Sequence, residues 1–211
     1  FCLIYDKISW RPTFYHFNDP IIVDDLYNLL EGNLDKLESS IFIDSKFLIK
    51  FPYSLKYFVT NEIINPFNTS RSKYPFQENI ENGIHGAGSV IGNTIQIASY
   101  LGFSEIYLVG CDCNYVIPEN ITSYGDKIKG SKYNNRYIVS DKDNDPNHFI
   151  SSYFGKNKYW HDPNKERMIE GHGQCYHGIK KQGKKIYNAG INSKCGVYEE
   201  VNYLDVLSNR I

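Results

Sequence analysis

Glu105-Ile106-Tyr107-Leu108-Val109-Gly110-Cys111-Asp112 is the stretch that indicates the fold of this 211-residue chain. Its apolar run does not alternate with polar residues, which is typical of a parallel strand covered on both faces. We therefore expect Glu105–Val109 to be an interior strand. The preceding residues 90–101 are apolar at helical spacing, and Gly102 is suited to end that helix. Helix, turn and buried strand form the second half of a βαβ unit, which predicts an α/β domain with a mostly parallel sheet.

Weaker patterns predict the other elements. Residues 14–17, 41–43 and 184–188 are typical of strands. Residues 22–30 have helical spacing, and Gly32 is expected to end that helix. A later helix is expected to begin with Asp162 as its N-cap and Pro163 in its first turn. The two long polar stretches are interpreted as loops: 65–82 on the surface, and 114–160 as a long loop or lid within the domain.

Composition narrows the class of protein. The 23 basic and 24 acidic residues give a net charge of −1, so the chain has no positive field to attract a nucleic acid. A content of 41% hydrophobic and 22% charged residues is that of a globular protein. No apolar run is long enough to span a membrane. We expect one cytoplasmic α/β domain over residues 1–211, and the apolar start at Phe1–Tyr5 indicates that a strand or helix has been cut and that the natural protein extends further N-terminally.

The cysteines do not form a familiar metal motif. Cys111 and Cys113 are close in sequence, but a C-x-C pair without a second pair or a suitably spaced histidine is a poor zinc signature. We interpret the cysteines as small buried residues around a strand end, with thiols that are reduced as in the cytosol. Residues i and i+2 of a strand are also about 6–7 Å apart, the far limit for a disulfide. We expect no metal site and no Cys111–Cys113 disulfide.

His161 is the histidine best suited to catalysis. It precedes a predicted helix N-terminus, whose dipole disfavours a positive charge, and a general base must be neutral. Packing or capping beside Trp160 is the alternative role. The glycine-rich segment Gly83–Ser89 leads into a helix and can offer backbone N–H groups to an anion, although a tight turn also explains it. The run Asp141–Asp145 lacks the later ligands of a calcium loop and is interpreted as a solvated acidic loop.

Several motifs together resemble a known bacterial domain family. They are Gly88-Ser89-Val90 before the helix, Gly102-Phe103, Glu105 to Asp112, Asn147-His148-Phe149, Tyr153-Phe154-Gly155-Lys156, Trp160-His161-Asp162-Pro163 and the early stretch from Trp10 to Pro20. They are similar to the family named for archaeal 6-hydroxymethylpterin diphosphokinase (MptE-like), found in polysaccharide and flagellin-glycosylation proteins. They also resemble the bacterial sialyltransferases of glycosyltransferase family 42. The resemblance implies a Rossmann-like three-layer domain. The family's first strand and nucleotide-binding Gly-Asn-Gly-Pro-Ser loop would lie before Phe1, so the chain alone is expected to be inactive.

The resemblance also implies a set of site residues. His161 corresponds to the catalytic base of the sialyltransferases, and Asp112 to the aspartate after the central strand. The further positions that would bind the donor or its phosphate are Gly88, Ser89, Asn18, Tyr115 and Tyr124, with Asn114 as an alternative to Tyr115.

These correspondences imply a metal-independent glycosyltransferase with no cofactor beyond its donor. The donor would be a nucleotide-activated sugar, specifically a CMP-linked acidic sugar, and the acceptor a surface glycan whose hydroxyl proton His161 accepts. One alternative is an ATP-dependent pyrophosphokinase with Mg²⁺ on Asp112 and Asp19. Another is a non-catalytic scaffold domain of a glycan-assembly protein. Peripheral association with the inner membrane and homo-oligomerisation stay open under each hypothesis.

Overall fold

The computed structural model describes residues 2–34, 38–51, 57–60, 62–63, 76–124, 137–161 and 163–208. The helices are α1 (Pro20–Asp25), α2 (Tyr27–Leu34), α3 (Val90–Tyr100), α4 (Lys165–Lys181) and α5 (Tyr203–Ser208), with short 3-10 helices at Cys2–Lys7, Ser45–Phe47 and Ile80–Asn82. The strands are β1 (Phe14–Phe17), β2 (Ser40–Asp44), β3 (Tyr57–Thr60), β4 (Glu62–Ile63), β5 (Ile84–His85), β6 (Glu105–Leu108), β7 (Ile121–Tyr124), β8 (Tyr137–Ser140), β9 (Tyr159–His161), β10 (Lys185–Asn188) and β11 (Glu199–Glu200).

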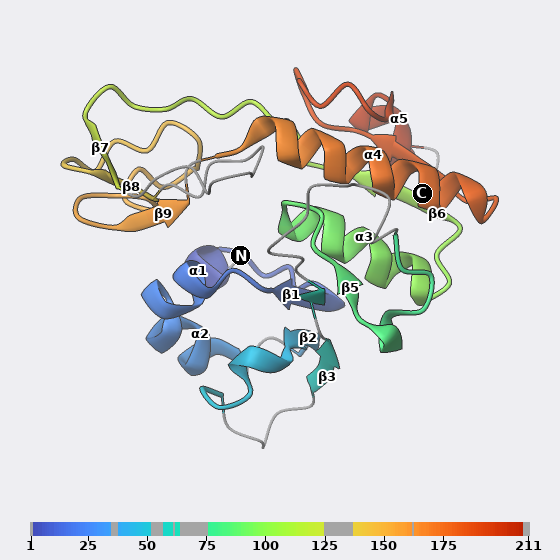
Figure 1. Cartoon of the computed structure of the whole chain (residues 1–211), viewed down its shortest axis with the longest axis horizontal. Coiled ribbons are helices and arrows are strands. Elements are labelled where there is room, and N and C mark those ends of the chain that lie inside the picture. The colour runs from blue at the N-terminus through green and yellow to red at the C-terminus, as the bar shows by residue number, and fades with distance from the viewer. Residues whose placement is uncertain are drawn as a thin grey trace.

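The described strands form several small sheets rather than one continuous sheet (Figure 1). Strands β1–β2–β3 and β11–β10–β6 are parallel, and β4 and β5 form a parallel pair. Strands β7–β8–β9 are antiparallel. The α/β class is confirmed as a mixed arrangement of small parallel sheets and one antiparallel sheet. A single Rossmann-like three-layer arrangement is not seen in these described ranges.

Strand β2 is covered on both faces. Ile41 and Ile43 pack with Val23 of α1 in one hydrophobic cluster. Phe42, between them, packs with Ile97 of α3 in another. Because successive side chains of a strand point to opposite faces, α1 lies over one face of this sheet and α3 over the other. The predicted strands at 14–17 and 41–43 are therefore confirmed as β1 and β2.

Helices α3 and α4 pack with β6 and β10 in a C-terminal core. Its buried residues include Ile95 of α3, Ile179 of α4, Leu108 of β6 and Ile186 of β10. The helix predicted after the glycine-rich segment is confirmed, and Gly102 follows it with a φ of +92°. The strand predicted at 184–188 is confirmed as β10.

The expectation that 105–109 is an interior strand is wrong for the described part of the chain. Strand β6 pairs with β10 on one side, and no other described strand pairs with it. Ile106 is only half-buried. The face of the strand away from α3 and α4 carries Tyr107, which stacks on Tyr187 with ring centres 5.1 Å apart. Both tyrosines are half-buried, and they line a pocket together with Asp205 and Val206 of α5.

Two predicted helix boundaries also need correction. The helix expected at 22–30 is two helices, and Gly32 lies inside α2 instead of ending it. Helix α4 begins at Lys165, because the Asn164 side chain accepts a hydrogen bond from the amide of Arg167 at 3.0 Å and caps the helix. Asp162 is therefore not the N-cap, and it lies outside the described residues.

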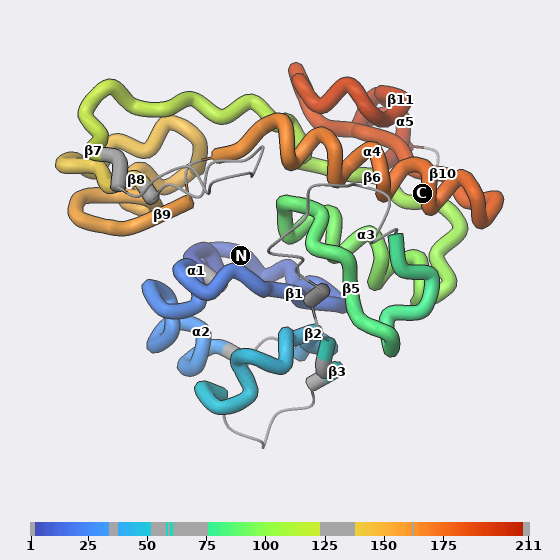
Figure 2. The backbone as a smooth tube through the Cα atoms, viewed as in Figure 1, coloured from blue at the N-terminus to red at the C-terminus, as the bar shows by residue number. Residues whose placement is uncertain are grey.

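Residues 114–160 contain more regular structure than a loop. Figure 2 shows the chain leaving β6 and running along the top of the view to β7, β8 and β9 at the left. These strands form the antiparallel sheet. The loop expected at 65–82 lies mostly outside the described residues. None of the described helices is both long enough and apolar enough to cross a bilayer.

Candidate functional site

His161 lies beside Asp19. His161 ends β9, whereas Asp19 follows β1 and caps α1, where its Oδ1 accepts a hydrogen bond from the amide of Ile21 at 2.9 Å. The distance from His161 Nε2 to Asp19 Oδ1 is 3.7 Å, and the two side chains are 48% and 39% exposed. The 3.7 Å separation is that of an ion pair rather than a hydrogen bond. An accessible imidazole next to a carboxylate can accept a proton from a bound hydroxyl.

Two contacts hold the end of β9 against the rest of the molecule. Trp160, directly before His161, is buried and stacks on Phe154 with ring centres 4.5 Å apart. Lys158 donates a hydrogen bond to Asp25 Oδ2 of α1 at 2.8 Å. His161 is thus a surface residue on a strand end that is fixed by its neighbours.

A second histidine–aspartate pair, Asp145 and His148, was not predicted from the sequence. The side chain of Asp145 is fully buried and does not belong to a solvated acidic loop. Its carboxylate accepts hydrogen bonds from His148 Nδ1 at 2.7 Å and from the amides of Asn147 at 2.8 Å and Phe154 at 3.2 Å. The ring of His148 lies 4.4 Å from that of Tyr153, centre to centre. The i, i+3 spacing of Asp145 and His148 was the signal in the sequence.

Three predicted donor-binding residues follow β6. Asp112 is exposed, and its carboxylate accepts a hydrogen bond from the amide of Asn114 at 3.4 Å. Asn114 is exposed as well. Tyr115 is half-buried, and burial raises the pKa of its hydroxyl, which keeps it a hydrogen-bond donor. Tyr124 ends β7, and its side chain lies outside the described part of the chain.

Gly88 and Ser89 pack against α4. Gly88 has a φ of +74°, and a Cβ there would lie 3.1 Å from the backbone oxygen of Arg167. Ser89 Oγ caps α3 by accepting a hydrogen bond from the amide of Gly92 at 3.2 Å, and it lies 3.5 Å from His172 Nε2. Close packing explains the glycine at this position.

The predicted site residues fall into two groups. Asn18 is half-buried and directly precedes Asp19, so it belongs with His161. Ser89 approaches His172, whose Nε2 is also 3.7 Å from the sulfur of Cys111, the residue before Asp112. The two groups are linked through Tyr115, whose ring lies 6.5 Å from that of His148, centre to centre. His148 packs on Phe154, which stacks on Trp160 beside His161.

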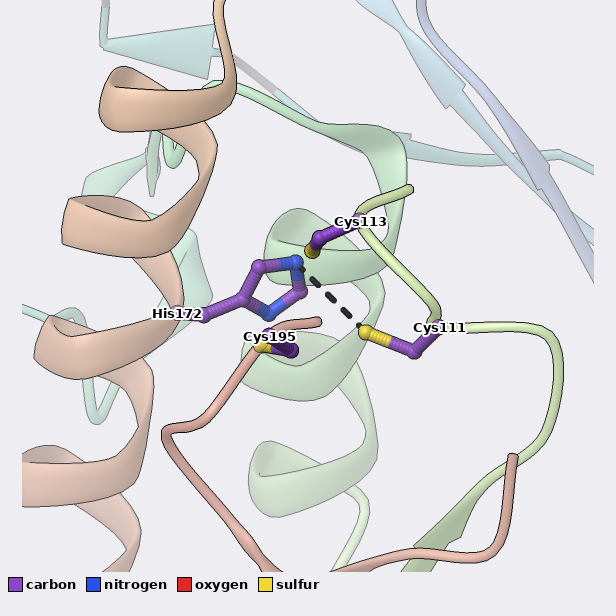
Figure 3. Close-up of side chains that lie close together, drawn as sticks. All are labelled: Cys111, Cys113, His172 and Cys195. Carbon is purple, nitrogen blue, oxygen red and sulfur yellow. Dashed lines mark hydrogen bonds between the residues drawn. The ribbon is translucent and has the colours of Figure 1, made fainter. Parts of the chain in front are cut away.

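Four buried side chains converge where the chain leaves β6: Cys111, Cys113, His172 and Cys195, here called the sulfur cluster (Figure 3). Their ligand atoms all lie within 4.8 Å of one another. His172 comes from α4, and Cys195 from the loop between β10 and β11. The strand geometry assumed for the cysteine pair is wrong, because β6 ends at Leu108 and the backbone at Cys113 turns with a φ of +51°.

Hydrogen bonds among the thiols set their protonation. The pKa of Cys195 is lowered to about 3, because Cys111 and Cys113 donate hydrogen bonds to its sulfur. The pKa of Cys111 is raised by its hydrogen bonds to Cys113 and Cys195 and by burial. Burial lowers the pKa of His172, so its imidazole is neutral at pH 7. Neutral imidazole and thiolate are the forms in which histidine and cysteine bind metals.

Tyr198 orients the imidazole of the sulfur cluster. Its hydroxyl donates to the backbone oxygen of His172 at 3.3 Å and lies 2.8 Å from His172 Nδ1. Because the hydroxyl proton is used on the carbonyl, Nδ1 carries the imidazole proton and donates it to the Tyr198 oxygen. The lone pair of Nε2 is then directed at the sulfurs. Two side chains fix the backbone of Cys111, whose carbonyl accepts hydrogen bonds from Asn188 and Ser193, each at 3.0 Å.

Comparisons with protein-family models, curated proteins and solved structures found no match to this chain.

Proposed function

We propose that this chain belongs to a glycosyltransferase that transfers a sugar from a nucleotide-activated donor to a hydroxyl of a surface glycan. The observation that carries the proposal is the His161–Asp19 pair, with half-exposed side chains at the carboxyl ends of β9 and β1. The motifs that resemble the MptE-like and sialyltransferase families support the same activity. They also favour a CMP-linked acidic sugar as donor and a Rossmann-like arrangement of the domain.

His161 acts as the general base in this proposal. Its Nε2 lies 3.7 Å from the Asp19 carboxylate, whose negative charge stabilises the imidazolium that forms. Nδ1 takes the proton of the acceptor hydroxyl while the acceptor oxygen bonds to the anomeric carbon of the donor sugar. The bond from that carbon to the phosphate oxygen breaks, and the nucleotide leaves with the electron pair.

The leaving phosphate needs hydrogen-bond donors rather than a proton. The Tyr115 hydroxyl is protonated at neutral pH, since burial raises its pKa, and it follows Asp112 and Asn114 at the end of β6. The proposal assigns donor binding to this segment, together with Tyr124 and the α3 N-terminus at Gly88 and Ser89. Donors aimed at the leaving group stabilise its charge without a catalytic metal.

The experiment measures sugar transfer and donor binding by the full-length protein. We expect His161→Ala to lower turnover by about 10²–10⁴-fold, the usual contribution of a positioned proton acceptor. Binding of the CMP-sugar should change little, because the base acts on the acceptor. Unfolding free energy should fall by no more than about 1 kcal/mol for a half-exposed polar side chain. His177→Ala, an exposed histidine of α4, is the matched control and should keep normal turnover.

Two outcomes contradict the assignment. Normal transfer by a folded His161→Ala protein would remove His161 from the reaction. Loss of transfer in His148→Ala alone would assign the role of the base to His148 of the Asp145–His148 pair.

Binding to a panel of nucleotides tests the activity itself. Binding of a CMP-sugar without Mg²⁺ agrees with the proposal. Binding of ATP that requires Mg²⁺ indicates a pyrophosphokinase, and no nucleotide binding indicates a scaffold.

A further inference from the structure

We propose that the sulfur cluster is a structural Zn²⁺ site, with the thiolates of Cys111, Cys113 and Cys195 and the Nε2 atom of His172 as its four ligands. The proposal replaces the expectation that the chain has no metal site. It goes beyond the proposed transferase activity and does not depend on it, since zinc can be measured in a chain that transfers no sugar.

The spacing of the ligand atoms suits a tetrahedral zinc ion. Zinc bonds of about 2.3 Å to sulfur and about 2.0–2.1 Å to nitrogen separate the ligand atoms by about 3.5–3.8 Å. His172 Nε2 and Cys111 Sγ are already 3.7 Å apart, and all four ligand atoms lie within 4.8 Å of one another. Movements of about 1 Å, within the reach of side-chain rotation, would complete the site.

The surroundings prepare the imidazole for metal binding. Zinc-bound histidine normally donates its other ring N–H to an oxygen, which fixes the tautomer. Tyr198 accepts that bond from Nδ1 at 2.8 Å and is itself held by the backbone oxygen of His172. This arrangement is independent of the cysteines, and it directs Nε2 at them.

An isolated buried cysteine in the same core looks different. Cys175 lies on α4 one turn after His172, and its thiol donates to the backbone oxygen of Gly92 at 3.4 Å. Its hydrogen bond is satisfied by the backbone, whereas the thiols of the sulfur cluster face each other and His172. Packing of small residues accounts for Cys175 and leaves the convergence of the other three unexplained.

The ligand types select the metal and its role. Three thiolates and one imidazole suit Zn²⁺ and not the oxygen-seeking Mg²⁺ or Ca²⁺. Four protein ligands fill the tetrahedral shell, which is the mark of a structural site and leaves no position for a substrate. Binding releases the thiol protons to solvent. The ion would tie the segment after β6 to α4 and to the β10–β11 loop, and it would fix Asp112 between two of its ligands.

The first test is the zinc content of the full chain, purified in reducing buffer without a chelator. We expect one zinc ion per chain, and its loss in Cys113→Ser. Cys175→Ser is the matched control, because it changes an equally buried cysteine of the same core and should retain the zinc. Equal zinc in both variants would overturn the proposal, as would a disulfide among Cys111, Cys113 and Cys195 in the reduced wild-type protein.

A second measurement keeps the test valid if Cys113→Ser does not fold. Wild-type chain stripped of metal by a chelator is titrated with Co²⁺ under reducing conditions. We expect the intense charge-transfer absorption of tetrahedral cobalt thiolate and its loss when Zn²⁺ is added. Tyr198→Phe keeps the ring but removes the hydroxyl, and it should weaken metal binding by about 10–100-fold. A titration without thiolate absorption, or unchanged affinity in Tyr198→Phe, would contradict the assignment.

Discussion

His16 of β1 is a titratable side chain whose charge depends on its packing. Its Nδ1 lies 3.0 Å from Thr94 Oγ1 of α3, and the Thr94 hydroxyl already donates to the backbone oxygen of Val90 at 2.8 Å. The Thr94 oxygen therefore accepts the His16 proton. Burial lowers the pKa of His16 to about 4, against an upward effect of Asp44 and a smaller downward effect of Lys46.

This shift predicts a loss of stability in mild acid. The pKa of His16 is about 6.5 in the unfolded chain and about 4 in the folded one, so the unfolded state binds the proton more readily. The contribution of neutral His16 to the free energy of unfolding is fully present above pH 6.5 and is lost as the pH falls toward 4. We expect His16→Asn, whose amide can keep the bond to Thr94, to have a flatter dependence of unfolding free energy on pH in this window. If the unfolding free energies of the wild-type and His16→Asn proteins changed with pH in parallel, His16 would not be the group responsible.

Helix α4 approaches the glycine-rich segment unusually closely. A Cβ at Gly171 would overlap the backbone oxygen of Ala87, and one at Gly178 would overlap the ring of Phe76. Despite these glycines, α4 continues to Lys181. Their low helix propensity is offset by the packing of two backbones that a side chain would separate.

Two glycines of α4 make a matched pair of substitutions. We expect Gly171→Ala to destabilise the protein by about 1–3 kcal/mol or more, because the added methyl group meets backbone that cannot rotate away. A Cβ at Gly173 meets no atom within 4 Å, so Gly173→Ala should be neutral or stabilise by up to about 1 kcal/mol. Chemical denaturation measures both. Similar effects of the two changes would show that the close approach is absent in solution.

At the scale of the whole molecule, the antiparallel sheet reaches back to the first helix of the chain. The ion pair between Lys158, just before β9, and Asp25 of α1 joins residues 133 positions apart. The same contact region brings His161 to Asp19. The geometry of the proposed base thus depends on how two distant segments dock.

The strength of this docking contact can be measured with a double-mutant cycle of Lys158→Met and Asp25→Asn. Both side chains are 32% exposed, so we expect a coupling free energy of only about 0.2–1 kcal/mol. Salt should reduce it, because partly exposed charges are screened. A coupling that is zero at low salt would mean that packing around Trp160 alone holds β9 in place.

Elements whose signals lie within a few residues of one another could be predicted from the sequence alone. The apolar positions of α3 and the glycine Gly102 predict that helix because periodicity and helix termination are local effects. The cap by Ser89 is seen only in the structure. Local signals also compete, as where Asn164 rather than Asp162 caps α4. The resemblance of motifs supplied the activity and its site residues, which stay predictions.

Which side chains meet depends on how distant segments of the chain pack together. His172 lies 61 residues from Cys111 in the sequence, and Asp19 lies far from His161. No rule on residue spacing could therefore have predicted either contact. The sulfur cluster exists because α4 and the β10–β11 loop pack against the end of β6, and that packing results from hydrophobic burial over the whole core. The burial of apolar surface is non-directional and acts between distant segments. Capping motifs and hydrophobic periodicity, in contrast, report only on contacts between residues that are close in sequence.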